Sequence, residues 1–440
     1  MGRRRGRSRE PAAVTAQTNE RIVIRRAGPE DAGGVGDVWL TSWHATFDFP
    51  PGHPDADVRR WLAEELMPAT EGWVAVDPED GGRVVGFMAL SAAMVEQLYI
   101  APDWIGRGLG DRLITLAKGR RPDGLDLYCF QVNTFARRFY ERRRFVPIAF
   151  GDGSNNEEHQ PDVRYAWRPT PVPSRTARSA DGTRIGVFTS GTGPPLILVH
   201  GASADHTTFR VVGPVFAERF TVDAIDRRGR GASGDTPPYA IEREFEDLAA
   251  VASALATEAG TPVDVVGHSY GGRCALGAAM LTDDIRRLVS YEGAPTPPGE
   301  RYGDADVLGE LRRLDAAGDP AGVLSTFMTR VVGMDAEALA RYRGDPVWPV
   351  RVAAAHTIVR ELESEAASPA AGLEALGRVR QPVLQIIGED SRPEFGAATR
   401  ALDARLSKGR VVVIDGARHA AHHTHPEAFV GAVTTFLAEP

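Results

Sequence analysis

The sequence is poor in the residues that mark several classes of protein. It holds only two cysteines among 440 residues, Cys129 and Cys274, so no disulfide framework is expected. No run of apolar residues approaches the ~18 that a membrane-spanning helix needs. The stretch Pro11–Thr18 also lacks the apolar core of an export signal. We therefore expect a cytoplasmic protein with reduced thiols and no membrane partner.

Negatively charged residues outnumber positively charged ones. Lys and Arg number 51 against 59 Asp and Glu, which gives a net charge of −8. No basic stripe with interleaved aromatic residues is present, so a nucleic-acid partner is not expected. The exception is the arginine-rich segment Arg3–Arg9, which predicts a disordered, solvated tail over residues 1–20.

A short segment in which proline alternates with other residues lies near the middle of the chain. Residues 168–175 read RPTPVPSR, and alternating prolines favour extended, semi-rigid backbone. A length of 440 residues is enough for two or three domains, each with its own core. We predict one domain over 21–168, a linker over 169–178 and a second domain over 179–440.

A strand–turn–helix pattern is the most informative feature of the second half. Residues 265–272 read VVGHSYGG, a β-branched strand that runs into G-x-S-x-G, and a potential helix follows. Gly267 and Gly271 leave space where larger side chains would collide. This context predicts a nucleophile elbow that holds Ser269 in a strained conformation above the end of a sheet.

Polar residues follow three further expected strands. Asp390 comes after the strand Pro382–Ile387, and His419 lies in the sequence GARHAA after the strand 410–414. A strand over 196–199 is followed by His-Gly-Ala, which ends at Ala202. With these motifs, the region from about residue 180 to the end resembles the α/β-hydrolase superfamily.

The resemblance implies a serine nucleophile, an acid and a base in the family's order along the chain. These positions are Ser269, Asp390 and His419. It also implies that the backbone N–H groups of Ala202 and Tyr270 stabilise the oxyanion. Other carboxylates can supply the acid, namely Glu389 or, after the strand 288–291, Glu292.

Three features near these motifs have other interpretations. A metal site is not expected at His422, His423 and His425, because no Cys partner or H-E-x-x-H frame accompanies them. Asp226 begins a glycine-rich segment, DRRGRGASG, that we interpret as a structural turn. Residues 294–376 are rich in Ala, Arg, Glu and Leu, and in this superfamily such an insertion is a helical cap over the active site.

The first half carries a different glycine-rich loop. A hairpin of strands over 72–77 and 83–90, with Gly81-Gly82 in its turn, precedes a strand over 94–100 and the loop Ile105–Gly110. A helix starts at Asp111, so successive N–H groups of the loop can face a pyrophosphate. A meander rather than a βαβ unit precedes the loop, which argues against a dinucleotide-binding fingerprint.

This half resembles the GNAT superfamily of acyl-CoA N-acyltransferases. The resemblance implies acetyl-CoA as co-substrate, a small-molecule or peptide amine as acceptor, and Tyr140 as the acid that protonates the departing thiolate. Glu96 can act as a base or be a solvated strand residue. The sequence departs from the family pattern at Ile105, where Gln or Arg is usual, and at Arg144, which replaces a glycine. The residues implied in cofactor binding are Leu98, Tyr99, Ile100, Gly106, Arg107, Gly108, Leu109, Gly110, Asp111 and Asn133.

The expected fold class is thus α/β: a GNAT-like mixed α+β domain followed by a doubly wound α/β-hydrolase sheet with a helical cap. The expected function is a fusion of a serine esterase or acyl hydrolase, acting on a small-molecule ester or amide, with an acetyl-CoA-dependent N-acetyltransferase; no metal is expected. The alternatives are a lyase or cofactor-free oxidoreductase with a CoA-sensing GNAT domain, and a non-catalytic ligand-binding protein.

Overall fold

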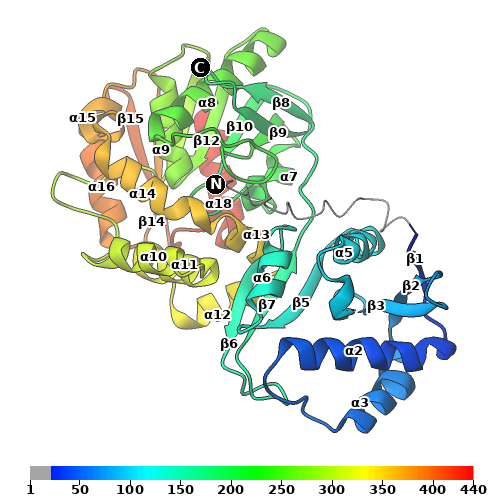
Figure 1. Cartoon of the computed structure of the whole chain (residues 1–440). Coiled ribbons are helices and arrows are strands. Elements are labelled where there is room, and N and C mark those ends of the chain that lie inside the picture. The colour runs from blue at the N-terminus through cyan, green and yellow to red at the C-terminus, as the bar shows by residue number, and fades with distance from the viewer. Residues whose placement is uncertain (1–20, 440) are drawn as a thin grey trace, which may run out of the picture. The chain divides into compact units, whose positions relative to one another are not determined.

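The computed structural model describes residues 21–439 (Figure 1), so the arginine-rich tail predicted over 1–20 lies outside the described residues. The chain divides into two compact units, Met1–Pro169 and Thr170–Pro440. None of the helices between residues 21 and 439 is long and apolar enough to cross a membrane.

The first unit contains two separate antiparallel sheets. The larger sheet has the order β1-β2-β3-β4, and the smaller one has the order β5-β7-β6. The predicted hairpin is confirmed, since β2 pairs with β3 and both Gly81 and Gly82 have positive φ. The helices and strands of this unit are β1 (Val23–Arg26), α2 (Ala32–Thr46), α3 (Asp55–Trp61), α4 (Met67–Ala69), β2 (Glu71–Asp77), β3 (Arg83–Leu90), β4 (Val95–Ile100), α5 (Leu109–Arg120), β5 (Leu125–Phe130), α6 (Thr134–Glu141), β6 (Val146–Gly151) and β7 (Asp162–Trp167).

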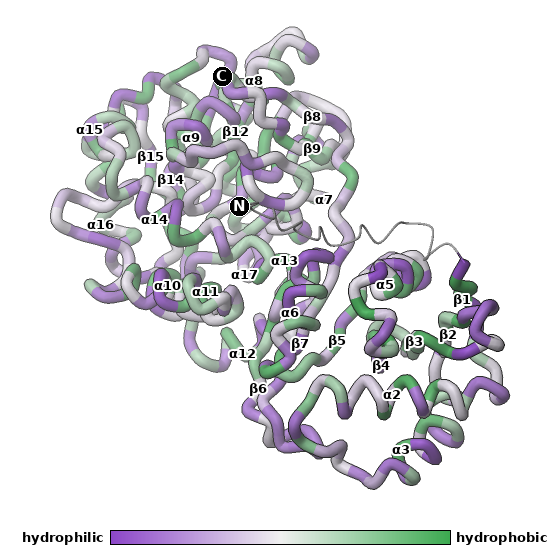
Figure 2. The backbone as a smooth tube through the Cα atoms, viewed as in Figure 1, coloured by the Kyte–Doolittle hydropathy of each residue, from purple (hydrophilic) through white to green (hydrophobic). Residues whose placement is uncertain are grey.

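Helix α2 packs on the larger sheet because one of its faces is apolar. Hydrophobic and hydrophilic residues alternate along it (Figure 2), as expected for an amphipathic helix. Trp39 and Trp43, one turn apart on the buried face, stack with their ring centroids 4.8 Å apart. Both rings belong to the single core that the two sheets and helix α5 share.

The second unit is built around one eight-stranded sheet with the order β15-β14-β13-β12-β10-β11-β9-β8. Strands β10 to β15 are parallel, whereas β8 and β9 form an antiparallel edge. The elements of this unit are β8 (Arg175–Arg178), β9 (Arg184–Ser190), β10 (Pro195–Val199), α7 (Gly213–Phe216), β11 (Thr221–Ile225), α8 (Ile241–Ala259), β12 (Val263–His268), α9 (Tyr270–Ala279), β13 (Ile285–Tyr291), α10 (Val307–Ala316), α11 (Pro320–Phe327), α12 (Ala336–Gly344), α13 (Trp348–Ala353), α14 (Ile358–Ala367), α15 (Leu373–Leu376), β14 (Val383–Gly388), α16 (Pro393–Asp403), β15 (Gly409–Ile414), α17 (Ala421–Thr424) and α18 (Pro426–Leu437).

Both faces of this sheet are buried, as in a doubly wound fold. Successive residues of β10 point to opposite faces, so Leu196 and Leu198 join one core cluster and Ile197 and Val199 join another. The first cluster includes residues of α7 and α18, and the second includes residues of α8, α9 and α16. The all-apolar sequence of β10 follows from this double burial.

The structure locates two segments that composition predicts, the linker and the cap region. The predicted linker over 169–178 ends in the edge strand β8, so its last four residues are part of the second unit's sheet. Helices α10 to α15 lie between β13 and β14 in the chain, within the region 294–376 expected to form a cap.

Candidate functional site

The sheet brings the polar residues of the second unit together at one edge. Residues Ala202, Ser269, Glu292 and His419 follow strands β10, β12, β13 and β15 respectively. These strands are parallel, so their carboxyl ends lie at the same edge, where ligands bind in open α/β sheets. All four residues line one cavity with about 480 Å³ of empty space, including the part that opens to solvent.

Ser269 lies in a sharp turn between β12 and α9 and has a strained backbone. Its φ of 52° and ψ of −124° lie outside the regions that L-residues ordinarily adopt. Flanking glycines make the turn possible: a Cβ on Gly267 would lie 2.5 Å from the oxygen of Gly271, and one on Gly271 would lie 2.4 Å from the oxygen of Val199. The turn is fixed to the next strand, because the Ser269 N–H donates to the oxygen of Tyr291 over 2.7 Å.

His419 is paired with Glu292. Its Nδ1 forms a short hydrogen bond with Oε2 of Glu292, and both side chains are buried. The other carboxylate oxygen accepts hydrogen bonds from Ser391 Oγ and, over 2.8 Å, from the Gly388 N–H. The imidazole also stacks on Phe395, with 4.5 Å between ring centroids. Glu292 therefore fixes the orientation and the tautomer of His419.

The expectation that Asp390 pairs with His419 is wrong in this structure, and Glu292 takes its place. Asp390 is exposed, and its N–H donates to the oxygen of Ala417 over 2.9 Å. The turn after β14 directs Ser391, not Asp390, toward the imidazole's partner. Glu389, the other alternative, is also exposed and accepts from the Gly416 N–H.

Two further histidines surround the His419 loop. His268 Nε2 lies 2.9 Å from the backbone oxygen of His419, and the His268 ring lies 4.5 Å from that of His422. Burial lowers the pKa of both rings well below the usual value, so they are neutral near pH 7. As a neutral donor, His268 holds the backbone that carries His419.

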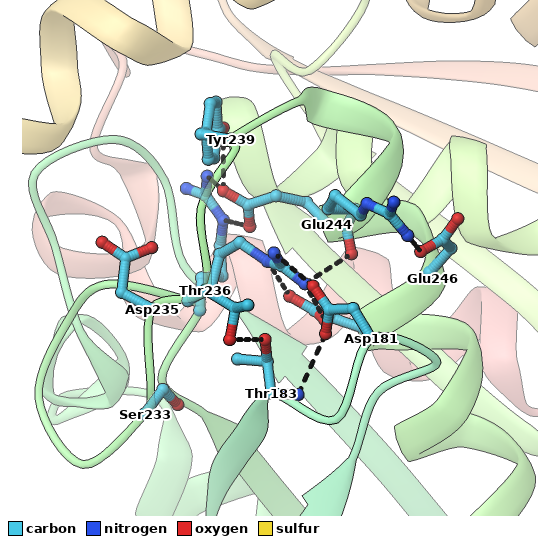
Figure 3. Close-up of polar contacts among 12 residues, drawn as sticks. Asp181, Thr183, Ser233, Asp235, Thr236, Tyr239, Glu244 and Glu246 are labelled. Carbon is cyan, nitrogen blue, oxygen red and sulfur yellow. Dashed lines mark hydrogen bonds and ion pairs between the residues drawn. The ribbon is translucent and has the colours of Figure 1, made fainter.

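Asp226 anchors the glycine-rich turn, as the sequence indicated. Its carboxylate accepts from the N–H groups of His206 and Ala232, at 2.8 and 2.9 Å. The arginines of this turn form buried ion pairs, and one of their partners, Glu361, lines the cavity. Figure 3 shows part of this network, in which Glu244 lies near Tyr239 and Asp181 accepts from the N–H of Thr183. Asp205, His206 and Asp226 form the one group of possible metal ligands found within residues 21–439, and Asp205 is already paired with Arg351.

Sequence reasoning missed several residues that line the cavity. Arg273 lies one turn after Ser269 on α9, and Glu361 and Glu365 come from the cap helix α14. No motif marks these positions, and the placement of Glu361 and Glu365 in the cavity depends on how α14 packs. The rest of the lining is mostly apolar or aromatic: Tyr302, Phe327, Val331, Val332, Ile358, Leu362 and Phe395.

In the first unit, two strands begin side by side and then part. Met94 and Asp126 form an isolated parallel bridge, and the Asp126 N–H donates to the oxygen of Ala93 over 2.8 Å. Beyond this point β4 and β5 belong to different sheets. The backbone of Leu98, Tyr99 and Ile100 therefore lies on an edge strand, where an extended ligand can form hydrogen bonds.

The glycine-rich loop next to β4 leads into helix α5. Gly106 and Gly108 both have a φ of 81°, which favours glycine, and a Cβ on Gly106 would meet no atom within 4 Å. The loop's side chains point elsewhere: Leu109 is buried, Arg107 stacks on Trp104 at 4.8 Å, and Asp111 pairs with Arg143. What the loop offers an anion is the backbone N–H groups at the N-terminus of α5.

Helix α6 carries the second set of expected residues. Asn133 is its N-cap and accepts from the Ala136 N–H over 3.0 Å, so its side chain has a structural role. Tyr140 is buried, and burial raises the pKa of its phenol, which remains protonated near pH 7. Gly110 lies where α5 meets α6, since a Cβ there would lie 2.9 Å from the Phe139 ring.

The structure also shows the environment of the two positions that depart from the family pattern and of the candidate base. Arg144 has a φ of 64°, the left-handed conformation that explains the family's glycine there. Ile105 is exposed at the start of the loop, with 46% of its surface accessible. Glu96 is half-buried on β4.

Comparison with known proteins agrees with the folds of the two units. Residues 196–432 match the model of the alpha/beta hydrolase family, and residues 68–147 match that of the acetyltransferase (GNAT) domain. The solved structure of an alpha/beta hydrolase from Sphaerobacter thermophilus superposes with a TM-score of 0.52 at 32% identity, covering 60% of this chain and all of that one.

Curated relatives match each half separately. A 2-(acetamidomethylene)succinate hydrolase from Mesorhizobium japonicum is 29% identical over 269 residues, 58% of this chain and 91% of that protein. A peptidyl-lysine N-acetyltransferase from Salmonella typhimurium is 34% identical over 124 residues, 28% of this chain and 83% of that protein. The chain belongs to the alpha/beta hydrolase family and carries a GNAT acetyltransferase domain in its N-terminal half.

Proposed function

We propose that the second unit is a serine hydrolase of carboxylic esters or amides, with Ser269 as nucleophile, His419 as base and Glu292 as acid. One observation carries the proposal: a serine on a strained strand-to-helix turn shares a cavity with a buried histidine–carboxylate pair. Nucleophile, base and orienting acid are the three parts that this chemistry requires.

In the proposed mechanism, His419 Nε2 takes the proton of Ser269 Oγ as that oxygen attacks the substrate carbonyl. The charge that develops on the carbonyl oxygen is stabilised by the N–H groups of Ala202 and Tyr270. His419 then gives its proton to the leaving alcohol or amine, which leaves an acyl group on Ser269. Water, deprotonated by the same imidazole, releases the carboxylic acid and restores the serine.

The cavity supports a small, mainly apolar acyl or leaving group. Most of its lining is aliphatic or aromatic, and helix α14 and residues 327–332, at and after the end of α11, supply much of it. The Mesorhizobium relative is named for hydrolysis of an acetamido compound, which supports amides beside esters as the substrate class.

The test is turnover of a short activated ester, p-nitrophenyl acetate, by the whole chain. Replacing Ser269 or His419 by Ala should lower kcat by on the order of 10³–10⁶ with nearly unchanged thermal stability. Retention of full activity by Ser269→Ala would refute the proposed nucleophile.

We further propose that the first unit transfers an acetyl group to a small-molecule or peptide amine. Acetyl-CoA, when bound, would supply the acetyl group as a thioester. The residues present fit this group, because the loop 105–110 offers backbone N–H groups at a helix N-terminus and β4 offers an unpaired edge beside β5. Tyr140, protonated because of its burial, is the proposed donor to the thiolate, and Glu96 the proposed base for the amine.

A further inference from the structure

One wall of the hydrolase cavity contains a buried hydrogen-bond acceptor without a partner. Glu361 lies on the cap helix α14, lines the cavity and is only 1% exposed. Its Oε1 is occupied, but its Oε2 has no hydrogen-bond partner among the described residues. Buried polar atoms in folded proteins are nearly always hydrogen-bonded, so an exception in a cavity wall points to a ligand.

Two arginines contact one carboxylate oxygen of Glu361. Its Oε1 accepts from Nη2 of Arg227 over 2.6 Å and forms an ion pair with Arg230. Arg227 is itself fixed by two hydrogen bonds, of 2.8 and 2.7 Å, to Glu244. Figure 3 shows the Glu244 carboxylate beside Tyr239, whose hydroxyl donates to it over 3.0 Å. These contacts fix which oxygen of Glu361 is free.

The other charged residues of the cavity have partners. Arg273 forms an ion pair with Glu365, and it donates to the backbone oxygens of Ala294 and Gly293 over 2.7 and 3.3 Å. Glu292 is hydrogen-bonded to His419. Among the described residues that line the cavity, Glu361 is the one with a fully buried carboxylate oxygen that lacks a hydrogen-bond partner, and the one arginine, Arg273, is ion-paired. This disfavours an anionic substrate group.

We propose that Glu361 determines specificity, and that its Oε2 accepts a hydrogen bond from an amide N–H or an amine of the substrate. The inference rests on the proposed hydrolase function and names its substrate class: esters or amides with a hydrogen-bond donor near the scissile carbonyl. A substrate without that donor leaves a buried carboxylate oxygen unpaired, and such pockets reject the analogue that lacks the group.

Two pairs of substrates test the proposal on the whole chain, one for each side of the scissile bond. On the acyl side, the p-nitrophenyl ester of N-acetylglycine is compared with that of N-acetylsarcosine, which carries N-methyl in place of N–H. On the leaving-group side, 2-acetamidoethyl butyrate is compared with its N-methyl analogue. We expect kcat/KM to favour the N–H member of at least one pair by about 10–100-fold, the effect of one hydrogen bond to a charged group.

Glu361→Gln is the matched variant. Arg227 and Arg230 require an acceptor at Oε1, so the amide oxygen takes that place and the NH₂ group faces the cavity as a donor. The preference for the N–H substrate should then fall to within about twofold of unity. The readout is the ratio of kcat/KM between the two members of a pair, which a general loss of activity in the variant does not change.

The outcomes distinguish a failure of the proposed hydrolase function from a failure of the proposed role of Glu361. If no ester is turned over and Ser269 is unreactive, the proposed hydrolase function fails. If all four esters are turned over but neither pair differs by more than twofold in the wild type, only the role of Glu361 is overturned. A preference that persists unchanged in Glu361→Gln overturns it as well. The wild-type comparison decides the matter even if the variant does not fold.

Discussion

Replacing Glu292 by Gln isolates the contribution of the carboxylate that orients His419. The change keeps the shape of the side chain and one acceptor oxygen. Because the Gly388 N–H donates to Oε1 over 2.8 Å, the amide oxygen should occupy that position and the NH₂ group should face Nδ1 of His419. The imidazole must then accept at Nδ1 and carry its proton on Nε2, so it cannot take the proton of Ser269.

The expected loss follows from this tautomer. In serine hydrolases, an acid-to-amide change of this kind lowers kcat by roughly 10⁴, so we expect a loss of about 10³–10⁴, or about 4–5.5 kcal/mol in the barrier. The assay is steady-state hydrolysis of p-nitrophenyl acetate, with the melting temperature as a check on folding. Asp390→Asn is the matched control: its carboxylate is exposed, and kcat should stay within about twofold. A large loss in Asp390→Asn with little loss in Glu292→Gln would refute this account of the acid.

Two further predictions concern the first unit of the intact chain. Acetyl-CoA should bind with micromolar affinity, roughly −7 to −9 kcal/mol by calorimetry, and Gly108→Glu should abolish binding through a clash and like-charge repulsion with phosphate. Gly108→Ala is the control, because it strains the same φ of 81° without adding charge, and it should bind acetyl-CoA more tightly than Gly108→Glu does. Equal binding of acetyl-CoA by the wild type and Gly108→Glu would contradict the proposed cofactor site. Burial lowers the pKa of Lys118 from 10.5 to about 8 in the folded protein. Between these two pH values the unfolded chain therefore keeps a proton on Lys118 that the folded chain has lost. Stability should therefore rise over that interval, by on the order of 1–2 kcal/mol, and Lys118→Met should remove the rise. Tryptophan fluorescence in denaturant reports mainly on this unit, which holds six of the seven tryptophans; an equal rise in both proteins would count against the argument.

Local steric patterns explain why much of the fold could be predicted. The turn at Ser269 needs glycine on both sides because backbone atoms lie within 2.5 Å of where a Cβ would be. The five consecutive residues 267–271 therefore suffice to predict the turn. The hairpin at Gly81-Gly82 and the strand β10 have equally local causes, positive φ in the first and burial on both faces in the second.

The acid was misassigned because its position depends on a turn with no sequence signature. Asp390 and Glu292 both follow central strands, and sequence alone does not reveal that the turn after β14 directs Ser391 inward and leaves Asp390 exposed. Glu361 was missed for a stronger reason. It lies on an ordinary amphipathic helix, and only the packing of α14 over Arg227 brings it into the cavity.

The most direct test of the central claim is the site of covalent labelling by a fluorophosphonate, located by peptide mass spectrometry on the intact chain. The account predicts one adduct, on Ser269, that is absent in Ser269→Ala and forms at least about 100-fold more slowly in His419→Ala. An adduct on a different residue, or labelling of Ser269 at an unchanged rate without His419, would contradict the proposed nucleophile and base.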